Sequence, residues 1–249
     1  MKTLSVVIPA LNEEHGIGDV LKEIPIKKLK DLGYKTEVLV IDNGSKDKTP
    51  HIARSQGAKV IIQPIRGYGN AYKAGFANAT GDIIATGDAD CTYPFEILPA
   101  VIHLIDDAGY DFINTDRLTT LSPDVMEGSH IWGNQLLTIA TRVLFNWPFK
   151  DSQSGMWIFK REIWQDLDVR SSGMPFSQEL KIEAYVRGFK CTEIPIEYRA
   201  RAGEVKLNTI KDGIGNITQL MKKRAEFGAF LPKSYNKQDE PEALGAGIE

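Results

Sequence analysis

Short apolar runs alternate with longer amphipathic segments in the first half of the chain. Five runs have the length and β-branched composition of buried strands, at residues 4–8, 37–41, 59–63, 82–86 and 111–114. Between them, residues 13–24 behind Asn12 and residues 46–55 behind Ser45 have the spacing of helices that follow a capping side chain. This alternation predicts an α/β fold with a mostly parallel central sheet and helices on both faces.

The second half is less regular but contains the same two kinds of element. Residues 131–147 and 209–227 have helical spacing, and residues 155–160 and 192–198 have the pattern of strands. From about Pro232 onward the sequence is polar and rich in residues that break helices. We therefore expect one domain over residues 1–231 and a mobile polar tail over residues 232–249.

Composition excludes several classes of protein. The 249 residues are 42% hydrophobic and 25% charged, which suits one sizeable core and not a disordered chain. A formal net charge of -3 gives no basic field, so we expect no nucleic-acid partner. Cys91 and Cys191 lack metal-ligand spacing and fit a reducing compartment as small buried side chains. No run approaches the roughly 18 apolar residues of a spanning helix, so we expect a soluble or peripheral protein.

A pair of aspartates follows the fourth apolar run. In Asp88-Ala89-Asp90 the alternation of side chains places both carboxylates on one side of the chain. Together they can hold a hard divalent cation through oxygen ligands while the cation bridges phosphate groups. In isolation the same residues also fit a solvated turn after a strand. The surrounding motifs therefore decide between the two interpretations.

Three ordered motifs supply that context. They are Val-Val-Ile-Pro-Ala-Leu-Asn-Glu-Glu at residues 6–14, Val-Ile-Asp-Asn-Gly-Ser at residues 40–45 and Asp-Ala-Asp at residues 88–90. In this order they resemble the family 2 glycosyltransferases, whose nucleotide-binding half has the fold called GT-A. The resemblance implies a nucleotide-sugar donor and a divalent metal, Mg²⁺ or Mn²⁺, bound by residues 1–118, with an acceptor half in residues 119–231.

The same resemblance implies roles for particular residues. Asp88 and Asp90 would bind the metal, with Asp90 as the principal and catalytic ligand, and Asp42 would accept hydrogen bonds from the base. The other donor-binding residues that it implies, besides Asp88 itself, are Pro9, Leu11, Asn12, Glu13 and Ala89. Asn43 stands where many relatives have a second aspartate, which leaves the base-facing carboxylate of Asp42 in place. Residues 42–45 also fit a tight turn with a serine helix cap, and the two roles are compatible.

Further motifs narrow the resemblance. In chain order they are Arg-Gly-Tyr-Gly at 66–69, Asp116-Arg117, Asp-Ser-Gln-Ser-Gly-Met at 151–156, Phe-Ser-Gln-Glu at 176–179 and Arg-Ala-Gly-Glu-Val-Lys-Leu at 201–207. This set resembles dolichol-phosphate mannosyltransferases and related polyprenyl-phosphate glycosyltransferases. It implies that Arg117 and Ser154 bind the acceptor and that Arg201 and Lys206 bring positive charge to the donor phosphates. For each cation taken alone, ordinary surface charge is the alternative.

The chemistry of the acceptor bears on the catalytic groups. A hydroxyl must lose a proton as it attacks, whereas a phosphate monoester is already anionic near neutral pH, so a phosphate acceptor needs no general base. The planar fork of Arg117 suits a bidentate grip on such a phosphate, which makes Arg117 a candidate catalytic cation. Glu179 is the candidate base if the acceptor is a hydroxyl, and it fits equally well a carboxylate that caps or solvates a helix.

Two helical segments bear on where the chain works. Residues 131–147 have a wide apolar face, and Ile214, Ile217 and Met221 form a second stripe before the basic residues 222–224. These faces either lie in a membrane interface or pack on the core. We expect an inverting hexosyltransferase that uses GDP-mannose or a UDP-hexose and a polyprenyl or dolichyl phosphate. It would be peripheral on the cytoplasmic face of a membrane, where a membrane-spanning partner subunit can add a second contact.

Two alternatives stay open. A family 2 enzyme with a soluble sugar or small hydroxyl acceptor would need a base and no membrane contact. A nucleotidyltransferase or a non-catalytic nucleotide-binding module would share the strand-helix alternation. The nucleotidyltransferase should carry a glycine-rich phosphate loop where Pro9-Ala10-Leu11-Asn12 stands.

Overall fold

The computed structural model describes residues 1–121, 125, 128–203 and 209–228. Lys206 and the predicted tail at residues 232–249 lie outside the described residues. The chain forms a seven-stranded sheet in the order β3-β2-β1-β4-β6-β5-β7. Its strands are β1 (Lys2–Ala10), β2 (Tyr34–Asp42), β3 (Lys59–Ile62), β4 (Ile83–Thr86), β5 (Phe112–Asp116), β6 (Trp157–Lys160) and β7 (Cys191–Pro195).

The sheet is parallel except at β6. β1 is parallel to β2 and β4, β2 is parallel to β3, and β5 is parallel to β7, whereas β6 is antiparallel to both β4 and β5. The carboxyl ends of the parallel strands and the amino end of β6 therefore meet at one edge of the sheet, called here the carboxyl edge. Ligands of open parallel sheets bind beyond this edge. The motifs at 88–90, 116–117 and 151–156 all come to it.

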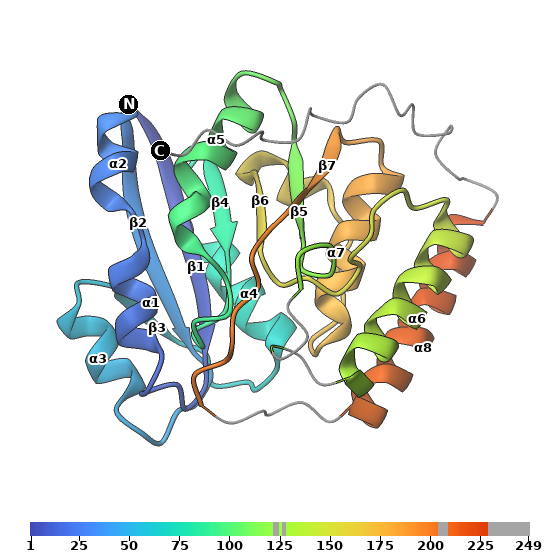
Figure 1. Cartoon of the computed structure of the whole chain (residues 1–249), viewed down its shortest axis with the longest axis horizontal. Helices are drawn as coiled ribbons and strands as arrows, with labels where there is room; N and C mark the ends of the chain where they lie inside the picture. Colours follow the sequence, from blue (N-terminus) through green and yellow to red (C-terminus); the bar gives the residue numbers. More distant parts are fainter. Residues whose placement is uncertain (122–124, 126–127, 204–208, 229–249) are drawn as a thin grey trace.

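Helices cover both faces of the sheet, as the alternation predicts (Figure 1). Those that pack on the face of Leu4, Val6 and Ile8 are α1 (Ile17–Glu23), α2 (Ile26–Asp31), α3 (Thr49–Ser55) and α5 (Leu98–Asp106), with the short turn η1 (Phe95–Ile97). Those on the face of Val7 are α4 (Tyr68–Asn78) and α7 (Pro175–Val186), with the turn η2 (Arg161–Asp166). The predicted α/β fold with a mostly parallel sheet and helices on both faces is confirmed.

A pair of helices forms an outer layer beside α7. The helices α6 (Gly128–Phe145) and α8 (Thr209–Phe227) lie side by side (Figure 1), and the ring centroids of Phe145 and Phe227 are 6.5 Å apart. Leu137 of α6 and Leu220 of α8 are buried in a small core that α7 completes. The inner faces of α6 and α8 are therefore packed against protein.

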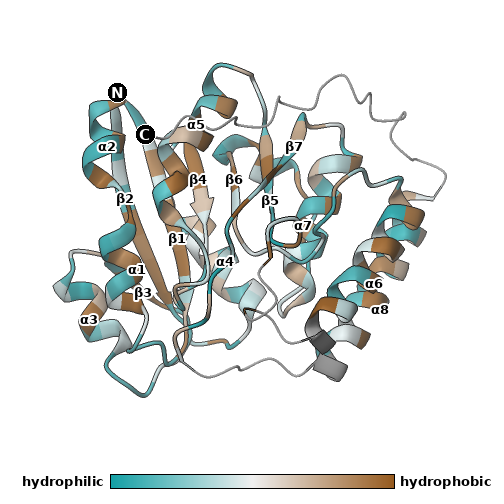
Figure 2. Ribbon diagram, in the orientation of Figure 1, coloured by the Kyte–Doolittle hydropathy of each residue, from teal (hydrophilic) through white to brown (hydrophobic). Residues whose placement is uncertain are grey.

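The strands are rich in apolar residues because helices bury both faces of the sheet. Figure 2 shows long hydrophobic stretches in β1 and β2. On the α4 and α7 face, Tyr72, Phe76, Trp157 and Phe176 form an aromatic cluster, in which the rings of Tyr72 and Phe176 stack with centroids 5.8 Å apart. Complete burial of one such side chain contributes roughly 1.5–3 kcal/mol. This cluster fixes α4 and α7 beneath the carboxyl edge.

The two predicted helix caps are wrong. α1 begins at Ile17 and α3 begins at Thr49, so neither Asn12 nor Ser45 precedes a first helical turn. Asn12 adopts φ 52°, and its Oδ1 accepts a hydrogen bond of 2.8 Å from the Lys46 N–H. Ser45 Oγ accepts one of 3.0 Å from the Asn12 N–H. The two polar side chains tie the loops after β1 and β2 to each other instead of capping a helix.

Candidate active site

The carboxylates of the Asp88-Ala89-Asp90 motif lie at the carboxyl edge directly after β4. Asp90 is buried, and its Oδ1 accepts hydrogen bonds from Thr92 Oγ1 at 2.6 Å and from the Thr92 N–H at 3.2 Å. Asp88 is partly buried. Burial first and the charge of Asp90 second raise the pKa of Asp88 to about 7, against the lowering effect of two nearby guanidinium groups. The contribution of the Asp90 charge to this raised pKa indicates that the two carboxylates lie close together.

Arg201 links this motif to the loop after β1. Its Nη1 is 3.2 Å from Asp90 Oδ2, and its Nη2 is 3.2 Å from Glu13 Oε1. Its Nε is buried and has no hydrogen-bond partner among the described residues. Gly16 permits this approach of the loop, because a Cβ there would lie 2.6 Å from the Ala89 carbonyl oxygen. Glu13, Ala89, Asp90 and Arg201 thus form one cluster, and their role in binding a donor stays a prediction.

Arg117 lies in the same region, and its guanidinium group is paired with another side chain of the protein. Its Nε and Nη2 donate to Asp151 Oδ2 at 2.7 Å and Oδ1 at 3.0 Å, and its guanidinium lies 5.3 Å from the centre of the Tyr198 ring. Burial alone would raise the pKa of Asp151, but the Arg117 charge holds it below its ordinary value. The edge of the guanidinium formed by Nε and Nη2 is therefore used for Asp151, and the bidentate grip of Arg117 on an acceptor phosphate stays a prediction.

The segment before β6 forms a wall beside the aspartates. Ser154 is completely buried, its hydroxyl is 2.6 Å from Thr115 Oγ1, and its carbonyl oxygen accepts hydrogen bonds from three side chains. The predicted contact between Ser154 and the acceptor is corrected, since a fully buried and paired hydroxyl does not face the site. The next residue does face it, because a Cβ built on Gly155 would lie 3.5 Å from Asp88 Oδ2.

The predicted nucleoside end of the site lies at the ends of β1 and β2. Pro9 pairs with Ile41 in adjacent strands, and Leu11 and Asn12 follow in the loop after β1. Asp42 is buried, and its Oδ1 accepts a hydrogen bond of 3.0 Å from the Ser45 N–H. The turn and the carboxylate predicted for residues 42–45 thus occur together.

Asn43 organises the neighbouring Arg-Gly-Tyr-Gly loop. Its Nδ2 donates to the carbonyl oxygens of Gln63 at 3.1 Å and Ile65 at 3.0 Å, and its Oδ1 accepts from the Gly67 N–H at 2.8 Å. An aspartate could make only the last of these bonds, since it has no N–H to donate. The asparagine therefore fits the loop that begins α4.

Glu179 lies in a different set of contacts. Its two oxygens accept hydrogen bonds from the N–H groups of Arg170 at 3.1 Å and Ser171 at 2.8 Å, and its Oε1 is 3.3 Å from Lys223 Nζ. Lys223 is itself buried and lies 2.7 Å from Glu183 Oε1. These contacts attach α8 and the 170–171 loop to α7. They give Glu179 a packing role, and a role as general base finds no support in them.

The residues fit a divalent metal that substrate phosphates help to hold. Within the described part of the chain, no group of three or more His, Cys, Asp or Glu side chains is arranged to hold a metal ion. Asp88 and Asp90 supply two carboxylates, and sites for Mg²⁺ often combine one or two carboxylates with phosphate oxygens and water. Burial and the charge of Asp90 raise the pKa of Asp88, and a bound cation would favour the ionised form of this carboxylate.

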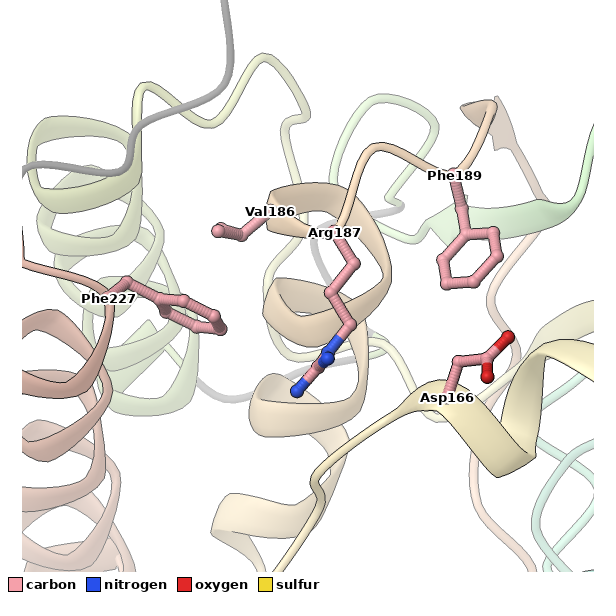
Figure 3. A pocket seen from close by; sticks show the side chains of 5 residues that line it. All are labelled: Asp166, Val186, Arg187, Phe189 and Phe227. Carbon is pink, nitrogen blue, oxygen red and sulfur yellow. The ribbon is translucent and has the colours of Figure 1, made fainter.

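Two described pockets lie away from these aspartates. One, of about 470 Å³, is lined by Asp166, Val186, Arg187, Phe189 and Phe227 (Figure 3). Phe189 lies two residues before the start of β7 at Cys191, so this pocket lies at the opposite edge of the sheet from the carboxyl edge. The other, of about 520 Å³, lies between α8 and the 170–173 loop. Neither contains Asp88 or Asp90.

Several residues of the site are not singled out by the sequence. Asp151 belongs to the motif at residues 151–156. Its pairing with Arg117 is not visible in the sequence, because the two residues are 34 positions apart. Tyr68, Tyr93 and Tyr198 gather around the aspartates from three separate segments, and the charge of Asp88 contributes to a raised pKa in each, after burial as the first cause. In the sequence, each of these residues is a tyrosine that stands next to a motif. This pattern does not distinguish a tyrosine of the site from a tyrosine of the core.

Comparison with known proteins identifies the class. Residues 5–168 match the family described as Glycosyl transferase family 2. The chain belongs to this family, and the predicted resemblance is confirmed.

Two similar proteins come from Haloferax volcanii. The chain is 40% identical over 217 residues to "Low-salt glycan biosynthesis hexosyltransferase Agl6", which covers 85% of this chain and 51% of that protein. It is 38% identical over 211 residues to "Dolichyl-phosphate hexose transferase", which covers 84% of this chain and 89% of that protein. The chain thus spans about half the length of the first relative and most of the second.

A solved structure shares the fold. It is glucosyl-3-phosphoglycerate synthase from Mycobacterium tuberculosis in complex with Mn²⁺, UDP-glucose and phosphoglyceric acid, with a TM-score of 0.73 and 24% identity. The match covers 94% of this chain and 81% of that chain. At this identity the likeness concerns the fold alone, and it agrees with the GT-A architecture expected from the motifs.

Proposed function

We propose that this protein transfers a hexose from a nucleotide-sugar to a polyprenyl or dolichyl phosphate, with inversion at the sugar. The observation that carries the proposal is the cluster at the carboxyl edge of a family 2 fold, where Asp88 and Asp90 lie with Arg201 and near Arg117. Such a site has carboxylates for a metal and cations for phosphates. Its task is to hold two anionic groups in line, which positioning and electrostatics accomplish.

Asp88 and Asp90 would hold the divalent cation. When bound, Mg²⁺ or Mn²⁺ would neutralise the charge that develops on the departing nucleoside diphosphate. Arg201 would bring positive charge to the donor phosphates at the same end of the site. Its guanidinium lies next to both Asp90 and Glu13, and its buried Nε–H would be available to donate a hydrogen bond to a phosphate. Asp42, near the loop that carries Asn12, would accept hydrogen bonds from the base.

A phosphate acceptor agrees with the groups that the site contains. Because the acceptor is already anionic, no side chain has to remove a proton from it. Glu179, the candidate base of the alternative mechanism, is occupied by contacts with the 170–171 loop and with Lys223. Arg117 would act on the acceptor through the charge of its fixed guanidinium, while Asp151 keeps that guanidinium in place. The name of the relative "Dolichyl-phosphate hexose transferase" supports this class of acceptor.

We propose that the protein acts at a membrane surface. Within the described residues, none of the helices has both the length and the apolar character needed to cross a membrane. The outer faces of α6 and α8 nevertheless expose a stripe of large apolar side chains, comprising Trp132, Leu136, Ile139, Val143, Ile214, Ile217 and Met221. We call this set the apolar stripe. A helix with such a face binds a bilayer interface reversibly, and a membrane-spanning partner subunit would strengthen the contact.

Of the three basic residues expected to flank the stripe, two can face a membrane. Lys222 is exposed and Arg224 partly exposed. The expectation that Lys223 faces a membrane is wrong, because its ammonium group is buried against Glu179 and Glu183. Each exposed cation near an anionic surface adds on the order of 1 kcal/mol, weakened by salt.

The proposal is tested by following labelled sugar. Wild-type protein is incubated with dolichyl phosphate in vesicles, Mg²⁺ or Mn²⁺, and labelled GDP-mannose or UDP-glucose. We expect label in the organic phase and its loss when a chelator is added. Transfer only to water-soluble acceptors would instead support the soluble-acceptor alternative.

Membrane contact is tested separately by flotation with anionic vesicles. Val143→Glu in the apolar stripe should reduce flotation, because it places a charge on the proposed contact face. Ile62→Glu is the matched control, since Ile62 is also an exposed apolar residue, 56% accessible, but lies on β3. Equal flotation of both variants and wild type would contradict membrane contact through α6.

A further inference from the structure

Lys181 is a buried lysine in α7 without an acidic partner. Its side chain is 1% exposed, and in the described part of the chain its ammonium group forms no ion pair with a carboxylate. Burial lowers the pKa of Lys181 to about 7, although the charge of Asp151 acts in the opposite direction. Lysines are rarely buried without a paired charge, because desolvation of the ammonium group is costly. A side chain kept at such a cost is expected to have a role other than stability.

The contact that Lys181 makes is with the backbone of the segment before β6. The Ser154 carbonyl oxygen accepts hydrogen bonds from Lys181 Nζ at 2.8 Å, Ser177 Oγ at 2.9 Å and Trp157 Nε1 at 2.7 Å. Ser177 and Lys181 are four positions apart, so both project from one face of α7. A carbonyl oxygen has two lone pairs, and here three donors converge on it. The peptide group between Ser154 and Gly155 is therefore held firmly against α7.

This peptide group lies between two parts of the candidate site. Near the start of the segment, Asp151 accepts hydrogen bonds from Arg117 Nε at 2.7 Å and Nη2 at 3.0 Å. At the end of the segment, a Cβ built on Gly155 would lie 3.5 Å from Asp88 Oδ2. A displacement of the Ser154 carbonyl would therefore be transmitted in both directions, to the guanidinium of Arg117 and to the surroundings of Asp88.

We propose that Lys181 is a positioning residue for the transfer step, which holds residues 151–156 where they fix Arg117 and stand beside Asp88. This inference rests on the proposed function, in which Arg117 acts on the acceptor and Asp88 on the donor diphosphate. The predicted nucleoside end of the site is formed by other segments, at the ends of β1 and β2. Lys181 should therefore affect turnover and leave the binding of the nucleoside diphosphate unchanged.

The first test separates turnover from nucleotide binding. Lys181→Met keeps an unbranched apolar stem and removes the donor, and Ser177→Ala removes the second donor from α7. With detergent-solubilised dolichyl phosphate and the preferred labelled donor at saturation, kcat should fall by about 10-fold in Lys181→Met. It should fall by about 100-fold in the double variant, the order expected when reacting groups are misplaced by about 1 Å. The dissociation constants of UDP and GDP, measured by calorimetry with Mn²⁺, should not change.

Stability distinguishes positioning from ordinary packing. Lys181→Met removes a desolvated charge that has no counterion, so the midpoint of thermal unfolding should be unchanged or raised. Lys223→Met is the matched control, since Lys223 is also 1% exposed and donates to a backbone carbonyl, that of Asp168, at 2.7 Å. This control leaves Glu179 and Glu183 without their counterion, so its midpoint should fall while the kcat of the folded protein stays that of wild type.

Amide hydrogen exchange supplies a measurement that does not depend on activity. Exchange at residues 153–157 should be faster in Lys181→Met than in wild type, because α7 then reaches the Ser154 carbonyl through Ser177 alone. Exchange in β1 and β2 should be the same in both proteins.

Three outcomes would overturn the inference. They are wild-type kcat in folded Lys181→Met and in its double variant, an equal loss of kcat in Lys223→Met, and unchanged exchange at residues 153–157. Failure of the proposed function is distinguishable, since it would appear as wild-type protein that transfers no sugar to dolichyl phosphate. In that case faster exchange confined to residues 153–157 would still support the positioning of this segment by Lys181.

Discussion

Replacement of Arg117 by alanine is expected to destabilise the fold before it reveals anything about the acceptor. The guanidinium makes two charged hydrogen bonds to Asp151, of 2.7 Å and 3.0 Å, and the two side chains are 8% and 0% exposed. Arg117→Ala would leave the Asp151 carboxylate buried without its counterion. Breaking a buried pair in this way costs about 3–5 kcal/mol.

The size of this loss matters because a domain has a total stability of only about 5–15 kcal/mol. For a chain of this length, each kcal/mol lowers the midpoint of thermal unfolding by about 2–4 °C. Arg117→Ala should therefore lower the midpoint by roughly 6–20 °C. Urea unfolding followed by circular dichroism should show a lower midpoint concentration with an unchanged slope, as expected for a loss of stability without a change in exposed surface.

A double variant separates the buried charge from the lost volume. Asp151→Asn in addition to Arg117→Ala removes the uncompensated charge, so the double variant should be more stable than Arg117→Ala alone. Arg117→Lys keeps the charge without the planar fork and should lie between wild type and alanine. A loss below about 1 kcal/mol in Arg117→Ala, the range of an exposed ion pair, would refute the reasoning.

Three further outcomes are expected. Asp90→Ala should abolish metal-dependent nucleotide binding in a thermal-shift assay while the protein remains folded, and a shift equal to that of wild type would contradict the metal site. Asp42→Ala should raise the dissociation constant of the donor nucleotide, and an unchanged constant by calorimetry would restrict Asp42 to its turn. Burial raises the pKa of Glu193 from 4.5 to about 7, so its folded form retains the proton and its contribution to stability disappears as pH rises through this interval. Relative to Glu193→Gln, wild type should lose at most about 1.4 kcal/mol per pH unit between about pH 4.5 and 7, measured by urea unfolding, and parallel pH profiles would contradict the assignment.

Hydrophobic pattern was sufficient to predict the sheet and its ligand edge. The predicted run at residues 82–86 became β4, and the run at residues 4–8 became the centre of the longer β1. This succeeded because strands buried on both faces are apolar throughout and end where polar residues begin. The antiparallel direction of β6 was not predictable from its composition, because an apolar run has no direction of its own.

Side-chain pairing in the site was beyond what the sequence contains. Asp88 and Asp90 are two positions apart and belong to one motif, whereas the partners of Arg117 and Arg201 come from distant segments. An arginine that binds a phosphate and one that binds a buried aspartate have the same appearance in a sequence. Tertiary contacts also decided the caps, since Asn12 and Ser45 satisfied their oxygens across two loops instead of at helix ends.

The reversed direction of β6 makes strand register a determinant of the active site. Residues 151–156 lead into β6, which pairs with β4 on one side and β5 on the other. A shift of one residue in these ladders would move the segment by about 3.3 Å and exchange the two faces of the strand. Gly155 would then leave Asp88, and Asp151 would leave Arg117, in a single event. A one-residue insertion at residues 153–156 should therefore be far more damaging than one at residues 107–109, which connect α5 to β5 at the opposite edge.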